Sequence, residues 1–347
     1  MKEIVQPLLD WYAVNKRELP WRQEKKNPYQ TWISEIMLQQ TRVEAVKGYY
    51  ERFIGRLPAL KELAEVPEGE LMKLWQGLGY YNRARNLKRA AQMIEEEYGG
   101  SFPESYRELL KLPGIGEYTA GAIASIAFGE RVPAVDGNVY RIYSRLREDS
   151  RDIAKEKVRR EIREKIAELV PEGQAGEFNQ ALMDLGAMVC VPNGMPICKD
   201  CPLKAYCLAG EKGTAQEYPV KAKKKPRRIE EYTVFVLEYQ GKYLLKRRPE
   251  KGLLAGLWGF PAKEGKVSLG ELRALLSEED ISQGEVELLG KARHIFSHVE
   301  WHMAGYLIHL KRIPVKWREG LVPATVQELR TEYSIPSAYS FYLGQIV

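Results

Sequence analysis

The segment Leu112-Pro113-Gly114-Ile115-Gly116 lies between two stretches of helical periodicity, the second running from near Tyr118 to Phe128. Two glycines in five residues let the backbone turn tightly and approach a partner closely. The N–H groups that begin the following helix can bind a DNA phosphate. Alone, the pattern favours a plain interhelical turn. With Asp136 about 20 residues further on, it favours a helix–hairpin–helix motif that binds DNA through Gly114 and Gly116.

Two carboxylic acids stand out. Asp136 lies in Val135-Asp136-Gly137-Asn138-Val139, where an ordinary helix N-cap is the better interpretation of the aspartate in isolation. Glu35 lies one turn into a helix rich in apolar residues, next to Met37 and Leu38. A glutamate on the buried side of a helix is costly unless it has a purpose, so Glu35 is a candidate catalytic residue.

All four cysteines lie close together, as Cys190-x7-Cys198-x2-Cys201-x5-Cys207. A disulfide framework would spread cysteines through the chain, so one tight group indicates a metal site. Four thiolates can bind zinc or an iron–sulfur cluster. Structural zinc usually uses two Cys-x2-Cys pairs and only one is present, so the spacing favours a [4Fe-4S] cluster.

The chain of 347 residues is long enough for two domains. Residues 1–212 have helical periodicity, with helices expected over 31–49, 82–98, 118–128, 153–168 and 177–189. Residues 213–231 are expected to form a basic linker, since six of the eight residues from Lys221 to Arg228 are basic. Alternating patterns then predict strands over 232–239, 242–246, 285–296 and 299–312, with helices over 268–277 and 324–330. The expected fold is multidomain: an all-α domain followed by a smaller α+β domain over 232–347.

The composition is that of a soluble globular protein, with 44% hydrophobic and 29% charged residues. No stretch approaches the roughly 20 apolar residues that cross a bilayer. Glu3 and Asp10 lie in a short amphipathic amino-terminal run, which is unlike a signal peptide. We therefore expect a cytoplasmic protein without a membrane partner. The net charge of +6 is a mild bias, more typical of a solvated surface than of a nucleic-acid site.

In order and spacing, these motifs resemble the helix–hairpin–helix glycosylases with an iron–sulfur cluster, the superfamily that includes endonuclease III. Leu19-Pro20-Trp21-Arg22 and Gly77-Leu78-Gly79-Tyr80-Tyr81 extend the likeness. In the bifunctional lyases a lysine stands two residues after the second hairpin glycine, where this chain has Tyr118. Since a phenol cannot form a Schiff base, the chain resembles the adenine DNA glycosylases of the MutY type, which cut only the glycosidic bond.

This resemblance implies a reaction and its residues. The substrate is adenine opposite 8-oxoguanine or guanine in double-stranded DNA, and the enzyme acts as a nucleoid-associated monomer. In that family's reaction Glu35 would protonate adenine and Asp136 would stabilise the sugar cation. Tyr118 and Asn138 would orient these carboxylates, and Arg22 would contribute a further hydrogen bond. The side chains implied to wedge into the base stack, or to lie beside the lesion, are Gln40, Thr41, Leu78 and Tyr80.

The carboxyl-terminal region resembles a Nudix domain through the segment 253–261, Leu-Leu-Ala-Gly-Leu-Trp-Gly-Phe-Pro. It lacks the acidic box that binds Mg²⁺ for pyrophosphate hydrolysis, since the acids over 271–280 have another arrangement. The resemblance therefore implies a recognition domain, in which Phe296, Ser297 and His298 sense 8-oxoguanine.

The chain departs from the family at two places. Seven residues separate Cys190 from Cys198 where six are common, and the turn near Asn193-Gly194 can absorb the extra one. One additional residue also lies between Arg22 and Glu35.

Three other functions were weighed. A bifunctional lyase is disfavoured by Tyr118, and a nucleotide pyrophosphatase is disfavoured by the missing metal box. A catalytically inert iron–sulfur DNA-binding protein would have no reason to keep both Glu35 and Asp136.

Overall fold

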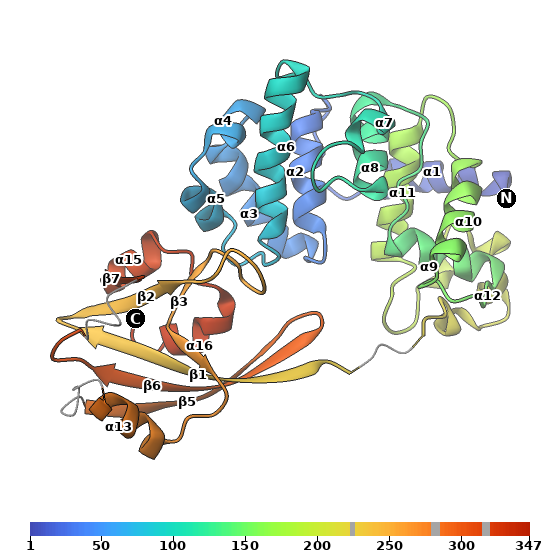
Figure 1. Cartoon of the computed structure of the whole chain (residues 1–347). Coiled ribbons are helices and arrows are strands. Elements are labelled where there is room, and N and C mark those ends of the chain that lie inside the picture. Colours follow the sequence, from blue (N-terminus) through green and yellow to red (C-terminus); the bar gives the residue numbers. More distant parts are fainter. Residues whose placement is uncertain (223–225, 279–284, 314–319) are drawn as a thin grey trace. The chain divides into compact units, whose positions relative to one another are not determined.

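The structure is a computed structural model that describes residues 1–222, 226–278, 285–313 and 320–347. Its contacts divide the chain into two units, both drawn in Figure 1. The first unit comprises Met1–Val66 and Arg85–Lys223, and the second comprises Pro67–Ala84 and Lys224–Val347. One segment inside the expected all-α region, Pro67–Ala84, therefore belongs to the second unit.

The first unit is helical. Helix α11 packs against α1, α8 and α9, and its residues Phe178, Leu182 and Leu185 are almost fully buried. The helices of this unit are α1 (Val5–Asn15), α2 (Pro28–Leu38), α3 (Val43–Arg56), α4 (Leu60–Glu65), α6 (Asn82–Tyr98, of which the residues from Arg85 belong here), α7 (Tyr106–Leu109), α8 (Glu117–Phe128), α9 (Gly137–Arg147), α10 (Glu156–Ala167), α11 (Ala175–Met188) and α12 (Leu208–Glu211).

The predicted helix–hairpin–helix is confirmed by α7, the turn over 110–116 and α8. Gly114 has φ +78°, a left-handed conformation that favours glycine. A Cβ atom at Gly114 would also lie 2.7 Å from the Cβ of Asn86 on α6, so the hairpin packs too closely for a side chain. Gly116 is the N-cap of α8.

One predicted helix was wrong. The sequence suggested a continuous helix over 31–49, whereas α2 ends at Leu38 and α3 begins at Val43. The break contains Gln40 with φ +59°, a left-handed backbone that cannot continue an α-helix. Apolar residues recur at helical spacing on both sides of the break. Hydrophobic periodicity alone therefore predicts one continuous helix.

The second unit is built on a seven-stranded sheet of order β3-β2-β1-β6-β5, with β4 beside β1 and β7 beside β2. Strand β1 is parallel to β6, and the other pairs are antiparallel. The strands are β1 (Arg228–Tyr239), β2 (Lys242–Arg247), β3 (Trp258–Gly259), β4 (Ala262–Glu264), β5 (Glu285–Ile295), β6 (Val299–His309) and β7 (Leu321–Ala324).

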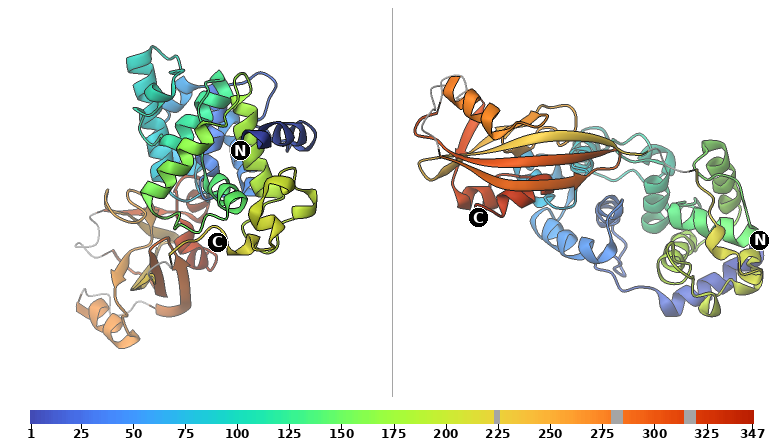
Figure 2. Two further views of the ribbon diagram at one scale, coloured as in Figure 1. Left: turned by 90° about the vertical axis from the view of Figure 1, so that its right-hand side faces the viewer. Right: turned by 90° about the horizontal axis from the view of Figure 1, so that it is seen from below.

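Helices cover both faces of this sheet. Figures 1 and 2 show α13 (Leu269–Glu278) on one face and α16 (Ser340–Leu343) on the other. Two separate cores result, because side chains alternate along a strand. Val234 and Val236 pack with Tyr342, whereas Leu237 packs with Leu272. Helices α5 (Glu68–Leu74) and α15 (Val326–Thr331) complete the unit.

The predicted linker over 213–231 is partly structured. Ala215–Glu217 forms a short 3-10 helix, and the carbonyl of Val220 accepts a hydrogen bond from the N–H of Ile153 at 3.1 Å. Strand β1 already begins at Arg228. Residues 223–225 of the basic run, and residues 279–280 of the acidic stretch, lie outside the described residues. Among the described helices, none combines the length and apolarity that a bilayer crossing requires.

Candidate active site

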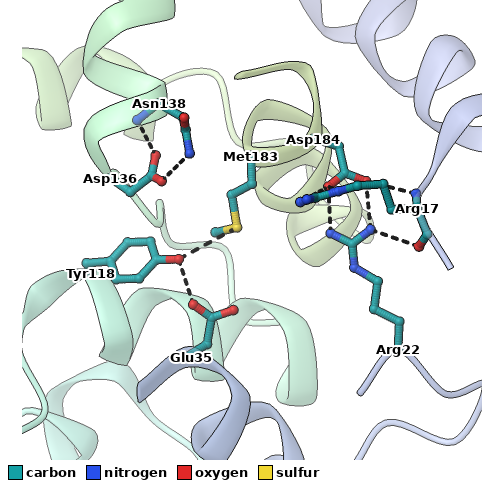
Figure 3. A network of polar contacts seen from close by, with 8 residues as sticks. All are labelled: Arg17, Arg22, Glu35, Tyr118, Asp136, Asn138, Met183 and Asp184. Atoms are coloured by element: carbon teal, nitrogen blue, oxygen red, sulfur yellow. Dashed lines mark hydrogen bonds and ion pairs between the residues drawn. The ribbon is translucent and has the colours of Figure 1, made fainter. Parts of the chain in front are cut away.

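Glu35 is a buried acid on α2. Only 6% of the residue is exposed, and the hydroxyl of Tyr118 on α8 donates a hydrogen bond to its Oε2 at 2.6 Å (Figure 3). Burial raises the pKa of Glu35 to about 7, the nearby charge of Asp136 also raises it, and the Tyr118 bond and Arg22 oppose the rise. Glu35 therefore titrates near neutral pH, where part of its population carries a proton.

Asp136 is the N-cap of α9. Its Oδ1 accepts hydrogen bonds from the N–H groups of Asn138 and Val139 at 2.8 and 2.9 Å, and its Oδ2 accepts one from Asn138 Nδ2 at 2.7 Å. Burial raises the pKa of Asp136, and these three donors offset part of the rise because they favour the anion. The N-cap interpretation is thus correct, and it places a fixed carboxylate at the helix start.

The two acids line one cavity of about 1450 Å³ within the first unit. Met183 on α11 also lines it, with its sulfur 3.7 Å from the Tyr118 hydroxyl (Figure 3). Further residues expected at the site from the sequence line the same cavity: Arg22, Gln40, Thr41, Gly116, Tyr118 and Asn138. A pair of titratable groups with shifted pKa values that line one cavity is typical of general acid catalysis.

Arg22 is paired with a residue that the sequence analysis did not identify. Its guanidinium donates to both oxygens of Asp184 at 2.7 and 2.9 Å, and Arg17 reaches the same carboxylate at 2.6 Å. Asp184 is fully buried. Burial alone would raise the pKa of Asp184, but Arg22 and Arg17 hold it below its usual range. The hydrogen bond expected from Arg22 is therefore made to Asp184, and Arg22 acts on Glu35 through its charge.

The remaining recognition residues lie in the second unit. Leu78 is buried, whereas Tyr80 is 49% exposed and has a left-handed backbone with φ +48°. Ser297 and His298 are exposed in the turn between β5 and β6, where Phe296 is half-buried. The hydroxyls of Tyr80 and Ser297 lie 2.7 Å apart. Two motifs separated by more than 200 residues thus meet at one place inside this unit.

The four cysteine side chains line one small cavity of about 30 Å³. Within the described part of the chain, no three potential ligands already lie at metal-binding distances. The surroundings nevertheless fit an anionic group. Arg145 is 3% exposed, and its guanidinium donates to the sulfur of Cys190 at 3.2 Å. A buried guanidinium is costly without a compensating negative charge, which metal-bound thiolates would supply.

A second buried arginine connects the two sites. Arg141 donates to the carbonyl of Cys190 and to Oδ1 of Asn138, both at 2.8 Å. Asn138 in turn donates to Asp136. A continuous chain of hydrogen bonds therefore links the backbone of Cys190 to the carboxylate of Asp136.

Comparison with known proteins gives the family. Residues 33–168 match the model of the HhH-GPD superfamily base excision DNA repair proteins, and residues 233–343 match the NUDIX domain. The adenine DNA glycosylase of Buchnera aphidicola subsp. Acyrthosiphon pisum is 36% identical over 90% of this chain and 89% of its own length. The chain belongs to the adenine DNA glycosylase family.

Larger relatives in this family extend beyond the match. The adenine DNA glycosylases of Arabidopsis thaliana and Homo sapiens are 38% and 36% identical over 84% of this chain. The matches span only 55% and 64% of those two proteins.

Solved structures resemble the helical part of the chain. A thermostable thymine-DNA glycosylase is 31% identical with a TM-score of 0.55, covering 61% of this chain and 96% of its own. A non-covalent endonuclease III–DNA complex is 25% identical with a TM-score of 0.52, covering 61% of this chain and 98% of its own. The predicted combination of an endonuclease III-like domain and a Nudix-like domain is therefore confirmed.

The sequence analysis missed Arg17, Arg141, Met183 and Asp184. For Asp184 a signal was present, because it lies among Leu182, Leu185 and Ala181 on an apolar helix, the pattern that identified Glu35. The partners of Asp184 could not be found in this way, since Arg22 lies 162 residues away.

Proposed function

We propose that this member of the adenine DNA glycosylase family hydrolyses the N-glycosidic bond of adenine opposite 8-oxoguanine or guanine in duplex DNA. The observation that carries the proposal is a buried Glu35 with a pKa of about 7 in the same cavity as the N-capping carboxylate Asp136. Glu35 titrates near neutral pH and so can carry a proton there, while three hydrogen-bond donors favour the anion of Asp136. This is the division of roles that two-carboxylate glycosidases use.

Adenine must leave the base stack before it can reach this cavity. Because Oε2 of Glu35 accepts the Tyr118 hydroxyl, the proton for the base is carried on Oε1. Transfer of that proton to N7 of adenine turns the base into a neutral leaving group. The bond between C1′ and N9 then breaks, and its electron pair leaves with the base.

Asp136 acts on the sugar that remains. Its carboxylate stabilises the positive charge that develops at C1′, and Asn138 keeps it oriented. Water adds to C1′ and loses a proton to give the abasic sugar. Arg22 limits the rise in the pKa of Glu35, so that the acid remains strong enough to donate its proton.

The product distinguishes this function from that of a lyase. A duplex carrying adenine opposite 8-oxoguanine should release free adenine and keep its strand intact until alkali is added. Borohydride should trap little protein on the DNA, because Tyr118 occupies the place where a lyase carries its amine. Absence of adenine release would contradict the glycosylase proposal, and efficient trapping through a lysine would assign the chain to the lyases.

We propose that the second unit reads the base opposite adenine. Tyr80 of this unit and Gln40 of the first unit both have a left-handed backbone and an exposed side chain. These features suit both side chains to wedge into the base stack. Ser297 and His298 are exposed, and in this proposal they bond the edge that differs between 8-oxoguanine and guanine. Replacing both residues with alanine should reduce the preference for 8-oxoguanine over guanine opposite adenine by about ten- to a hundredfold. This factor corresponds to the loss of one hydrogen bond of roughly 1–3 kcal/mol. An unchanged preference would contradict this assignment.

We also propose that Cys190, Cys198, Cys201 and Cys207 hold a [4Fe-4S] cluster. Such a cluster would fix the loop that carries Lys199 and Lys204, which can reach phosphates. The protein is proposed to act as a cytoplasmic monomer on nucleoid DNA. The one tight group of cysteines is typical of a metal site and not of a disulfide framework, which supports a reducing compartment.

A further inference from the structure

Two backbone hydrogen bonds hold the turn between β5 and β6. The N–H of Phe296 donates to the carbonyl of Val299 at 2.8 Å, and the N–H of Arg228 on β1 donates to the carbonyl of His298 at 3.2 Å. Arg227, itself exposed, donates to the carbonyl of Phe296 at 3.1 Å. Ser297 and His298 are exposed, and the hydroxyl of Ser297 lies 2.7 Å from that of Tyr80. These contacts hold the exposed side of the turn, and its buried side is held through Phe296, which packs against the core.

Phe296 rests edge-to-face on the ring of Trp301. The two centroids are 4.9 Å apart with an interplanar angle of 69°. The ring of His294 packs against Phe296 at 4.6 Å and 67°. Aromatic pairs of this geometry add stability beyond the area they bury and favour particular ring orientations. Trp301 is 2% exposed, so it is the buried partner of this pair.

Trp301 is fixed by three further contacts. Its indole N–H donates to Oε2 of Glu230 on β1 at 2.9 Å, the residue directly opposite it in the parallel β1–β6 pair. The guanidinium of Arg248 lies over the ring at 5.1 Å, and the ring of Tyr232 lies 4.8 Å away. These contacts fix both the polar edge and the face of the ring, so the surface that Trp301 presents to Phe296 has one orientation.

We infer that Trp301 is the positioning residue of the recognition loop: it fixes Phe296 and thereby sets where Ser297 and His298 meet the base opposite adenine. The inference rests on the proposed function and deepens it. Trp301 makes no contact with DNA in this account. Its effect is on discrimination between 8-oxoguanine and guanine, and the glycosidic chemistry depends on Glu35 and Asp136.

The test uses the full-length protein with Trp301→Phe and Trp301→Leu. Single-turnover rates of adenine release are measured opposite 8-oxoguanine and opposite guanine, and their ratio is the readout. Trp301→Leu removes the aromatic platform and should lower the ratio by roughly two- to tenfold, the worth of an aromatic pair. Trp301→Phe keeps an aromatic ring but loses the hydrogen bond to Glu230. Its ratio should therefore lie between that of the unaltered protein and that of Trp301→Leu.

Phe260→Leu is the matched control. Phe260 is 3% exposed in the same core, and its ring packs on Tyr339. This variant destabilises the same domain and should leave the ratio unchanged. The thermal midpoint of each variant is measured, so that the rate ratios can be compared between variants with a similar loss of stability. An equal fall in the ratio for Phe260→Leu would overturn the inference, because the effect would then be general softening of the domain.

A Ser297→Ala, His298→Ala double variant separates this inference from the proposed function. If the double variant loses its preference while Trp301→Leu keeps it, the loop holds its own position and the inference fails. If the double variant also keeps its preference, the assignment of the loop to recognition fails, and the role of Trp301 fails with it. A graded fall across Trp301→Phe, Trp301→Leu and the double variant supports both.

Discussion

Glu35 and Asp184 are both buried carboxyls on helices, yet their surroundings move their pKa values in opposite directions. Glu35 faces a phenol and a second carboxylate, so burial dominates and its pKa rises to about 7. Asp184 faces two guanidinium groups, and these outweigh the same burial. Both carboxyls lie on helices rich in apolar residues, although only Glu35 was identified from the sequence. Their folded partners decide which of the two can carry a proton near neutral pH. The first suits an acid catalyst and the second a structural ion pair.

The acid role of Glu35 predicts a pH dependence. A general acid must be protonated to act, so the rate of adenine release should be highest below pH 7 and fall as the pH rises through about 7. Single-turnover rates between pH 5.5 and 9 on saturated DNA would measure this. Glu35→Gln has no proton to deliver and should be slower by roughly a hundredfold or more.

Glu177→Gln is the control for this pH profile. Glu177 lines the same cavity, but its side chain is 37% exposed and paired with Lys26. Its replacement should keep the profile of the unaltered protein. A profile without a fall above neutral pH in the unaltered protein would remove Glu35 from its role as the acid.

The ion pairs of Asp184 predict a large effect on stability. Asp184→Asn leaves the guanidinium groups of Arg17 and Arg22 without their counter-charge, which should lower the free energy of unfolding by about 3 kcal/mol. Because the pKa of Asp184 is depressed in the folded protein, this stabilisation is present above its unfolded pKa of about 4 and is lost as the pH falls through the folded value. Urea unfolding at pH 7 and at low pH would show whether the difference between the two proteins shrinks in acid. A constant difference would contradict the ion-pair explanation.

At the scale of elements, short-range patterns were the reliable guide. The hairpin glycines and the N-cap Asp136 each follow from residues within a few positions of one another. The break at Gln40 does not, because nothing in Gln39-Gln40-Thr41 forbids a helix. Its left-handed backbone is costly for a residue other than glycine. Such strain is found at functional positions, so the failure of the helix prediction at Gln40 agrees with the proposed role of this residue.

Asp136 combines two roles that substitutions can separate. Asparagine is as good an N-cap as aspartate, so Asp136→Asn should keep nearly all of the stability. Asp136→Ala loses the cap and should cost about 1 kcal/mol. Both lose the carboxylate and should release adenine slower by roughly a hundredfold or more. Calorimetry beside single-turnover assays would test this, and near-normal release by Asp136→Asn would refute the two-carboxylate mechanism.

At the scale of the whole molecule, the two units were only partly visible in the sequence. The change from helical to alternating periodicity predicted the second domain correctly. It could not show that Pro67–Ala84 belongs to the second unit, because this segment reads as part of a helical domain. Side chains of this segment bind backbone carbonyls far along the chain, as in the bond from Gln76 to Ile335 at 2.8 Å. Long-range contacts of this kind leave no local pattern.

The cysteine group leads to a prediction for the intact protein. Protein purified without oxygen should be brown and contain about four iron atoms per chain, as expected for a cubane cluster with four thiolate ligands. Because Arg145 and Arg141 bind the sulfur and carbonyl of Cys190, removing the cluster should loosen the loop over 190–207 and weaken DNA binding, measured at one salt concentration. The second unit has its own two cores, so its unfolding transition should not move. Stoichiometric zinc without iron would contradict the cluster and leave a structural zinc site as the explanation of the four thiols.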